Sequence, residues 1–148
     1  MKTKKFGKIH TCSLLLVFLF IAIISCNKNP YNRLLGTWEN KQQTYTETYI
    51  YDGINFDAGS YKMKVKSIIW SSDASGIIYG RYTENTYDSS VVGKYYAVSF
   101  KDLTDTSISI CGAYKDGKMS ADSLVEAITE FTINNGYYGT YSSCKKVK

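Results

Sequence analysis

Cysteine has the most definite chemistry of the side chains in this sequence, and two of the four cysteines, Cys111 and Cys144, lie far from the N-terminus. Two thiols in one domain can form a disulfide, stay free and buried, or serve a metal or redox role. An oxidising compartment favours the disulfide. Closing the intervening loop would stabilise the domain by roughly 3–4 kcal/mol. The bond requires the two Cα atoms to lie within about 7 Å of each other, a condition that the fold must meet.

Histidine chemistry is almost excluded. The only histidine, His10, lies near the N-terminus, in a segment that is interpreted below as a signal peptide. Histidine is the usual general base near neutral pH and the commonest metal ligand. Its absence from the rest of the chain argues against serine or cysteine triads and common zinc sites. We expect no catalytic residue, no metal and no cofactor. A carboxylate mechanism would need two acids about 5–10 Å apart, and no pair stands out.

The side chains that could line a ligand site are mostly aromatic. All 14 tyrosines follow Cys26, and most should pack in a core or at its rim, where the hydroxyl reaches water. Candidates for the end or the cavity of a barrel are Trp38, Glu47 and Tyr96. An inward Glu47 would indicate a polar ligand or a buried pair with Arg81. An exposed position at a strand edge is the alternative that we favour for this carboxylate.

The first 25 residues have the organisation of a secretory signal. A basic start is followed by an apolar run from Ser13 to Ile24 and by a small residue, Ser25. The basic residues are Lys2, Lys4, Lys5 and Lys8. This order of basic, apolar and small residues is typical of a signal peptide. The apolar run is short for a membrane-spanning helix, which needs about 20 residues.

Residues 23–26, Ile-Ile-Ser-Cys, resemble the lipobox of bacterial lipoproteins, and the relaxed first position is similar to that of spirochaete lipoproteins. The resemblance implies cleavage before Cys26 and acylation of that residue, for example with palmitate. Several acyl chains give a firm membrane anchor, since each buried methylene adds roughly 0.8 kcal/mol. A plain cleaved signal or an uncleaved anchor is the alternative. Because Asn27 is not acidic, we expect the outer membrane of the cell envelope, on either its periplasmic or its surface face.

The chain divides into a signal peptide (1–25), a lipidated cysteine with a short tether (26–33) and one domain (34–148). Four of the 18 basic residues and none of the 13 acidic residues lie in the signal. The remainder therefore carries 14 basic and 13 acidic side chains. A net charge near +1 gives no reason to expect nucleic acid as a partner.

Alternating apolar and polar residues predict short antiparallel strands throughout residues 34–114. The clearest alternation runs from Tyr61 to Trp70, with apolar residues on one face and lysines on the other. The first face holds Tyr61, Met63, Val65 and Ile69, and the second holds Lys62, Lys64 and Lys66. We interpret the lysines as a solvated face, and a binding stripe for an acidic polymer as the alternative. The other predicted strands are 35–39, 44–51, 77–84, 95–101 and 106–114, with 52–59 as a loop. On the last two, Tyr96, Val98 and Phe100 should share a face, opposite Ile108, Ile110 and Tyr114.

The apolar spacing becomes helical between Ser120 and Phe131. Ser123 and Glu126 have the spacing of a capping box. A final hairpin is predicted beyond this helix, with residues 131–133 and 137–147 as strands and Asn135-Gly136 in the turn. The pattern as a whole predicts a mainly β fold, an antiparallel up-and-down barrel of about eight strands with one short helix.

Gly36-Thr37-Trp38 resembles the Gly-x-Trp signature of lipocalins and related calycins. The resemblance implies a lipocalin-like barrel whose closed end is plugged by Trp38. A late arginine packs on this tryptophan in that family, and here Lys145 or Lys146 could take its place. The second family signature, Thr-Asp-Tyr, is not matched by Thr104-Asp105-Thr106.

Two fainter resemblances to known proteins imply no ligand for this chain. Residues 36–40, 80–82 and 93–101 are similar to strands of avidin-type barrels, but the tryptophans of the biotin site are missing. Parts of residues 93–144 resemble small spirochaete lipoproteins without a defined function.

These observations favour a membrane-anchored, non-catalytic binding or interaction module of the bacterial envelope. It would be a monomer that holds a small apolar or aromatic ligand or contacts a protein partner. The alternative is a structural lipoprotein with a filled barrel and no ligand. A carboxylate-based glycan hydrolase is a remote third hypothesis.

Overall fold

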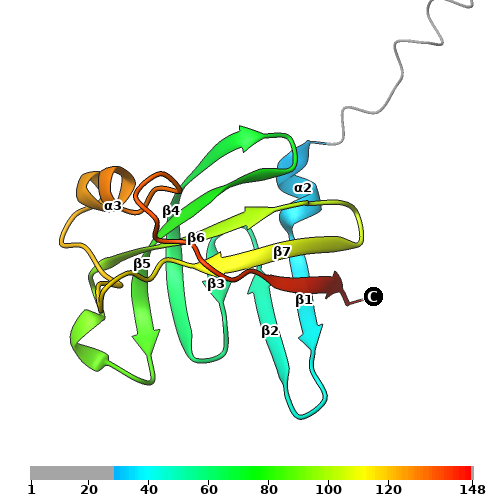
Figure 1. The fold of residues 1–148 in the computed structure, drawn as a ribbon, viewed down its shortest axis with the longest axis horizontal. Helices are drawn as coiled ribbons and strands as arrows, with labels where there is room; N and C mark the ends of the chain where they lie inside the picture. The colour runs from blue at the N-terminus through cyan, green and yellow to red at the C-terminus, as the bar shows by residue number, and fades with distance from the viewer. Residues whose placement is uncertain (1–28, 148) are drawn as a thin grey trace, which may run out of the picture.

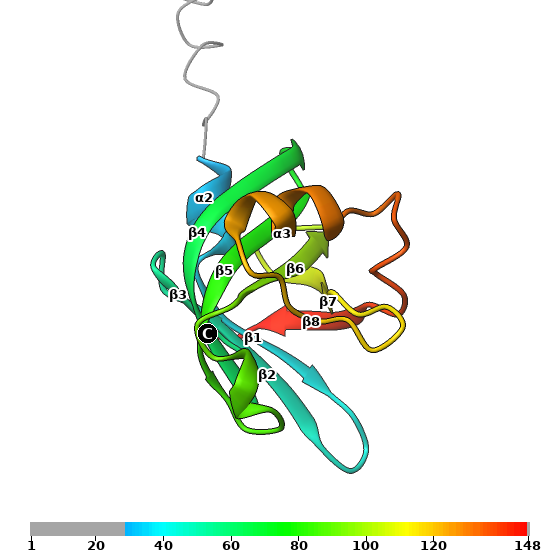
Figure 2. The same ribbon diagram turned by 90° about the vertical axis from the view of Figure 1, so that its left-hand side faces the viewer.

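A computed structural model of the chain describes residues 29–147, which form a closed eight-stranded antiparallel barrel. Each strand pairs with its neighbours in sequence, and β8 pairs with β1 to close the ring. The strands are β1 (Gly36–Lys41), β2 (Thr46–Tyr51), β3 (Asn55–Asp57), β4 (Tyr61–Ser72), β5 (Ser75–Asn85), β6 (Tyr95–Lys101), β7 (Ser107–Gly112) and β8 (Ser142–Lys146). The prediction of a mainly β, up-and-down barrel is confirmed. Figures 1 and 2 show the ring from two sides. The signal peptide and Cys26 lie outside the described residues.

One end of the barrel is closed by the short helix α2 (Pro30–Leu34). Asn29 caps it, since the Asn29 side chain accepts a hydrogen bond from the Tyr31 amide, and Pro30 suits the first helical position because it needs no N–H partner there. Leu34 is buried against the core. The last residues of the predicted tether, residues 30–33, are therefore helical and packed on the domain.

The opposite end of the barrel, which we call the mouth, lies at the bottom of Figure 1. It is formed by the β1–β2 and β3–β4 turns and the β5–β6 loop with its 3₁₀ turn η1 (Ser89–Val91). The connection from β7 to β8 runs along the side of the barrel (Figure 1) and contains α3 (Leu124–Glu130), the predicted helix. The Ser123 side chain accepts a hydrogen bond from the Glu126 amide at 3.1 Å, as the capping-box spacing predicts.

The interior of the barrel is packed with side chains. Trp38, Met63, Ile78, Val98 and Phe100 are all nearly fully buried. These residues come from four different strands and occupy the lumen between the two ends. Side chains therefore fill the lumen at the level of these five residues.

Irregular pairing corrects the predicted faces of β4. A β-bulge between Val65 and Ser67 shifts the register with β5, so the alternation reverses beyond it. Ile69, predicted to share a face with Met63, is instead 45% exposed. Trp70 packs edge-on against the buried Phe100, with ring centroids 4.9 Å apart.

Three further predictions about the elements are wrong. The predicted loop 52–59 contains the short strand β3. Tyr114, predicted to face the core, lies beyond the end of β7 and is exposed. Asn135-Gly136 forms a turn but no hairpin, and residues 131–141 contain no strand. This segment instead packs on the outside of β5, β6 and β7, where the hydroxyl of Tyr79 donates to the Phe131 carbonyl at 3.1 Å.

Candidate functional site

A pocket of about 530 Å³ opens at the mouth of the barrel. This size is within the range of small-molecule sites, roughly 300–1,000 Å³. Its walls come from the start of β2, the β3–β4 turn, the β5–β6 loop, the start of β6 and the end of β7. The lining residues are Thr46, Glu47, Thr48, Tyr49, Ala58, Gly59, Ser60, Tyr61, Tyr87, Tyr96 and Gly112. We call it the mouth pocket.

The short length of β3 opens the mouth pocket. This strand pairs with β2 only through the last two residues of β2, Ile50 and Tyr51. The first part of β2, residues 46–49, therefore has β1 on one side and no strand partner on the other. The chain turns away after Asp57, whose side chain accepts a hydrogen bond from the Gly59 amide, so β3 ends before it can pair with residues 46–49.

Tyrosine rings form the inner wall of the mouth pocket. The ring of Tyr61 lies edge-on to those of Tyr82 and Tyr96, at centroid distances of 5.8 and 5.3 Å. Tyr82 and Tyr96 stack at 4.9 Å. Edge-on and offset contacts of this kind are the favoured aromatic geometries. With Tyr49 these three residues form the tyrosine cluster, contributed by β2, β4, β5 and β6. Tyr49, Tyr61 and Tyr96 line the pocket, and Tyr82 packs against the rings of the last two.

The hydroxyls of the tyrosine cluster stay protonated under physiological conditions. Burial, with a smaller contribution from the nearby Glu47 carboxylate, raises the pKa of Tyr49 to about 12. Burial likewise raises the pKa values of Tyr61, Tyr82 and Tyr96 above their ordinary value, with contributions from the neighbouring tyrosines. The cluster therefore presents neutral phenols and ring faces, and no negative charge of its own.

Glu47 supplies the charge in the mouth pocket. It is the one ionised side chain in the lining, because the other lining residues are Thr, Ser, Ala, Gly and Tyr. Its Oε2 accepts a hydrogen bond from Nδ2 of Asn40, across the β1–β2 pair, at 2.9 Å. The Tyr49 hydroxyl lies 3.5 Å from the same oxygen. Both donors are neutral, so neither forms an ion pair with the carboxylate.

Arg81 does not pair with Glu47, which excludes one of the two expectations for an inward acid. The Arg81 side chain instead donates to the Gly93 carbonyl at 2.5 Å. Within residues 29–147, Glu47 forms no ion pair with any lysine or arginine. Glu47 lies on the open edge of β2, but its side chain is half-buried at the pocket wall and not exposed as we favoured.

A glycine gives Tyr96 the space to reach across the mouth. A Cβ atom at Gly112 would collide with the Tyr96 hydroxyl. The absence of a side chain on β7 at this point therefore sets the position of the Tyr96 ring. Gly112 and Tyr61 are pocket residues that the sequence did not single out, although Tyr61 was assigned to an inward face.

Trp38, the third predicted residue, lies at the closed end and not in the mouth pocket. It is 1% exposed, and its Nε1 donates to the Leu34 carbonyl of α2 at 3.0 Å. Nζ of Lys146 lies 4.8 Å from the centroid of the Trp38 ring. Of the two lysines considered, Lys146 is the one that packs on the Trp38 ring.

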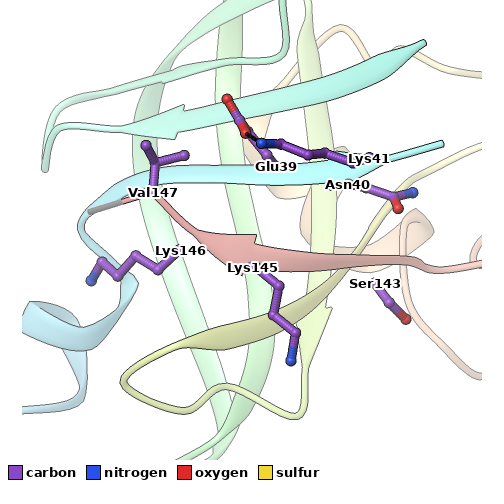
Figure 3. A pocket seen from close by; sticks show the side chains of 7 residues that line it. All are labelled: Glu39, Asn40, Lys41, Ser143, Lys145, Lys146 and Val147. Atoms are coloured by element: carbon purple, nitrogen blue, oxygen red, sulfur yellow. Dashed lines mark ion pairs between the residues drawn. The ribbon is translucent and has the colours of Figure 1, made fainter. Parts of the chain in front are cut away.

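A second depression, about 470 Å³, lies where β8 and β1 diverge (Figure 3). It is bordered mainly by charged side chains. Glu39 pairs with Lys41 at 3.3 Å, and Lys146 is held at the closed end by the Arg33 carbonyl. Most of its charged side chains already have a partner in the protein. This depression therefore has fewer unpaired groups for a ligand than the mouth pocket has.

The two cysteines are free and buried. Cys144 lies opposite Ile108 in the β7–β8 pair, whereas Cys111 is three positions further along β7. Three positions span about 10 Å along a strand, and an odd offset places the side chains on opposite faces. The favoured disulfide is therefore wrong for this fold, and the alternative of two buried thiols holds. Burial raises the pKa of Cys144 to about 11.

The predicted lysine face of β4 is a solvated surface. Nζ of Lys62 forms ion pairs with a carboxylate oxygen of Asp57 at 3.8 Å and with one of Glu84 at 3.1 Å. Lys64 and Lys66 are exposed. The described part of the chain contains no group of three or more His, Cys, Asp or Glu placed to hold a metal ion. No helix between residues 29 and 147 has the length and apolar character to cross a membrane.

Comparison with known proteins gives a likeness of fold. No protein-family model and no curated protein sequence matches the chain. The crystal structure of pallilysin from the spirochaete Treponema pallidum is similar, with a TM-score of 0.50 and 10% sequence identity. The similarity covers 96% of this chain and 98% of that one. At this identity the likeness concerns the barrel architecture alone, which this chain shares with a spirochaete protein.

Proposed function

We propose that this chain is a lipid-anchored lipoprotein of the bacterial envelope whose lipocalin-like barrel binds a small ligand without catalysis. The observation that carries the proposal is the mouth pocket, where a single carboxylate faces an aromatic wall. Ligand sites combine mostly apolar or aromatic surface with a few polar groups that set orientation. Glu47 and the tyrosine cluster supply these two kinds of surface in one pocket.

The lining of the mouth pocket favours binding over hydrolysis. Glycoside hydrolysis by carboxylates needs two acids that flank one bond. Glu47 is the only Asp or Glu in the lining. This observation makes the glycan hydrolase the weakest of the three hypotheses.

A structural lipoprotein without a ligand remains the second candidate, and the filled lumen favours it. Nearly fully buried residues from several strands occupy the barrel below the mouth. A ligand would therefore sit in the mouth and would not enter the barrel. Chemical-shift mapping on residues 27–148 separates the candidates, because a fragment that binds here must move amide signals of the mouth pocket. A fragment library that moves no signal at the mouth would favour the structural candidate.

The anchoring part of the proposal rests on the lipobox-like residues before Cys26. In cells fed labelled palmitate, we expect the label to enter the chain and the chain to sediment with membranes. Cys26→Ser should abolish both. Cys12→Ser is the matched control and should retain both, because Cys12 lies within the signal peptide. A labelled Cys26→Ser protein would contradict lipidation at this residue.

A further inference from the structure

We infer that the ligand of the mouth pocket is a small organic ammonium ion, with its cationic nitrogen at Glu47 and its apolar or aromatic body on the tyrosine cluster. This inference rests on the proposed function, since it names the chemical class that the same pocket accepts. It is carried by the charge and the surface of the lining.

The charge of the pocket selects against anions. Glu47 carries the only charge in the lining, and neither of its hydrogen-bond donors, Asn40 and Tyr49, neutralises it. Most other acidic side chains at the surface have a lysine or arginine within ion-pair distance, as Glu84 does with Lys62 and Asp122 with Lys94. A partly buried carboxylate without a cation gains most from a positively charged partner. An anionic ligand would meet repulsion instead.

The aromatic wall adds a second preference for a cation. An ammonium group near the face of a tyrosine ring is attracted by the negative ring quadrupole. Tyr49, Tyr61 and Tyr96 all line the mouth pocket, and Tyr87, which is 85% exposed, stands at its rim. One carboxylate surrounded by several rings is the arrangement that binds organic ammonium ions. A bare metal ion would lack the further oxygen ligands that it needs.

Polar side chains can complete the coordination of the ammonium group. Thr46, Thr48 and Ser60 border the mouth pocket beside Glu47. An alkylammonium group has three N–H donors. The carboxylate can accept one or two of them, and a hydroxyl oxygen can accept another. The open side of β2 gives the ligand access from solvent.

Three probes with one common body test this inference on residues 27–148. Phenethylamine is cationic, 2-phenylethanol is neutral and 3-phenylpropionate is anionic. Binding is measured by titration, with chemical-shift mapping to locate it. We expect phenethylamine to bind at the mouth pocket at least tenfold more tightly than the other two. Glu47→Gln, which keeps the shape and an acceptor oxygen, should remove this preference.

Asp73→Asn is the matched control. It also removes one negative charge, but at the opposite end of the barrel, where Asp73 is exposed and pairs with Arg33. This variant should retain the tenfold preference. A preference that survives in Glu47→Gln, or that disappears in Asp73→Asn, would overturn the inference.

The remaining outcomes separate the ligand class from the proposed function. Equal binding of all three probes at the mouth pocket, or tighter binding of the anion, would overturn the ammonium class and leave ligand binding in place. Failure of all three to bind would also overturn the ammonium class. The proposed function itself falls only if the wider fragment library also leaves the mouth signals unmoved.

Discussion

Lys146 lies over the ring of Trp38, with 4.8 Å between Nζ and the ring centroid. The same ammonium donates to the Arg33 carbonyl at 3.0 Å, and Nε1 of Trp38 donates to the Leu34 carbonyl. The last strand, the first strand and α2 are thereby joined at one point. This junction closes the end of the barrel opposite the mouth pocket.

Loss of the Lys146 side chain should destabilise the closed end. Lys146→Ala removes a partly buried cation–π contact and a charge-assisted hydrogen bond, so the free energy of unfolding should fall by about 1–3 kcal/mol. Lys145→Ala is the control, because Lys145 is exposed on the other face of β8. Its effect should stay within about 0.5 kcal/mol. Urea unfolding of both variants measures the difference, and equal effects would contradict the role of Lys146.

Cys111 and Cys144 should behave as protected thiols. Residues 27–148 should show the same intact mass before and after reduction. A thiol reagent should modify Cys144 slowly in the native state, because burial raises its pKa to about 11 and few molecules are thiolates at neutral pH. Both cysteines should react at once in denaturant. A mass increase on reduction would contradict the strand register that separates them.

The strand pattern predicted most of the barrel, because side-chain alternation follows directly from the pleat of a strand. It misplaced Ile69, since the β-bulge between Val65 and Ser67 exchanges the two faces and the consecutive apolar residues 68–70 fit either assignment. It also predicted a hairpin at Asn135-Gly136, whereas residues 131–141 form no strand and pack on the outside of the barrel. Local turn chemistry does not specify such long-range packing.

The sequence predicted individual residues of the candidate site but not how the fold brings them together. Glu47 and Tyr96 stood out because of their residue types, and both line the mouth pocket. The pocket that they line depends on the early end of β3 and on the space left by Gly112. The closed ring brings the start of β2, the start of β6 and the end of β7 together at the mouth. Trp38 was correctly associated with a barrel end, because the Gly-x-Trp resemblance implies that position.

Because of the tyrosine cluster, we expect the free energy of unfolding to fall at alkaline pH. The folded protein holds the Tyr49 proton more tightly than the unfolded chain does, with a pKa of about 12 against 10.0. The resulting stabilisation is complete below pH 10 and is lost as the pH rises towards 12. Tyr61, Tyr82 and Tyr96 act in the same direction.

Urea unfolding at a series of pH values should therefore show a decline in stability that begins near pH 10, where tyrosines of the unfolded chain titrate. Tyr49→Phe should make the decline shallower, because one of the titrating groups is gone. A profile identical to that of the original protein would show that Tyr49 does not contribute.

Gly112 should control access to the mouth pocket. In Gly112→Ala the new Cβ meets the Tyr96 hydroxyl, so the ring must move and the pocket must change shape. We expect probe binding at the mouth to weaken at least tenfold, with a moderate loss of stability of about 1–3 kcal/mol from overpacking. Gly139→Ala provides the control, because a Cβ there meets no atom within 4 Å. Its binding and stability should match the original protein, and unchanged binding in Gly112→Ala would contradict the assigned pocket.

Native mass spectrometry tests the central claim most directly. Residues 27–148 are purified without refolding, and the mass of the folded protein is compared with that of the denatured chain. We predict an additional mass from a co-purified small molecule, which Glu47→Gln reduces or abolishes. Equal folded and denatured masses, together with a fragment library that moves no amide signal of the mouth pocket, would contradict ligand binding.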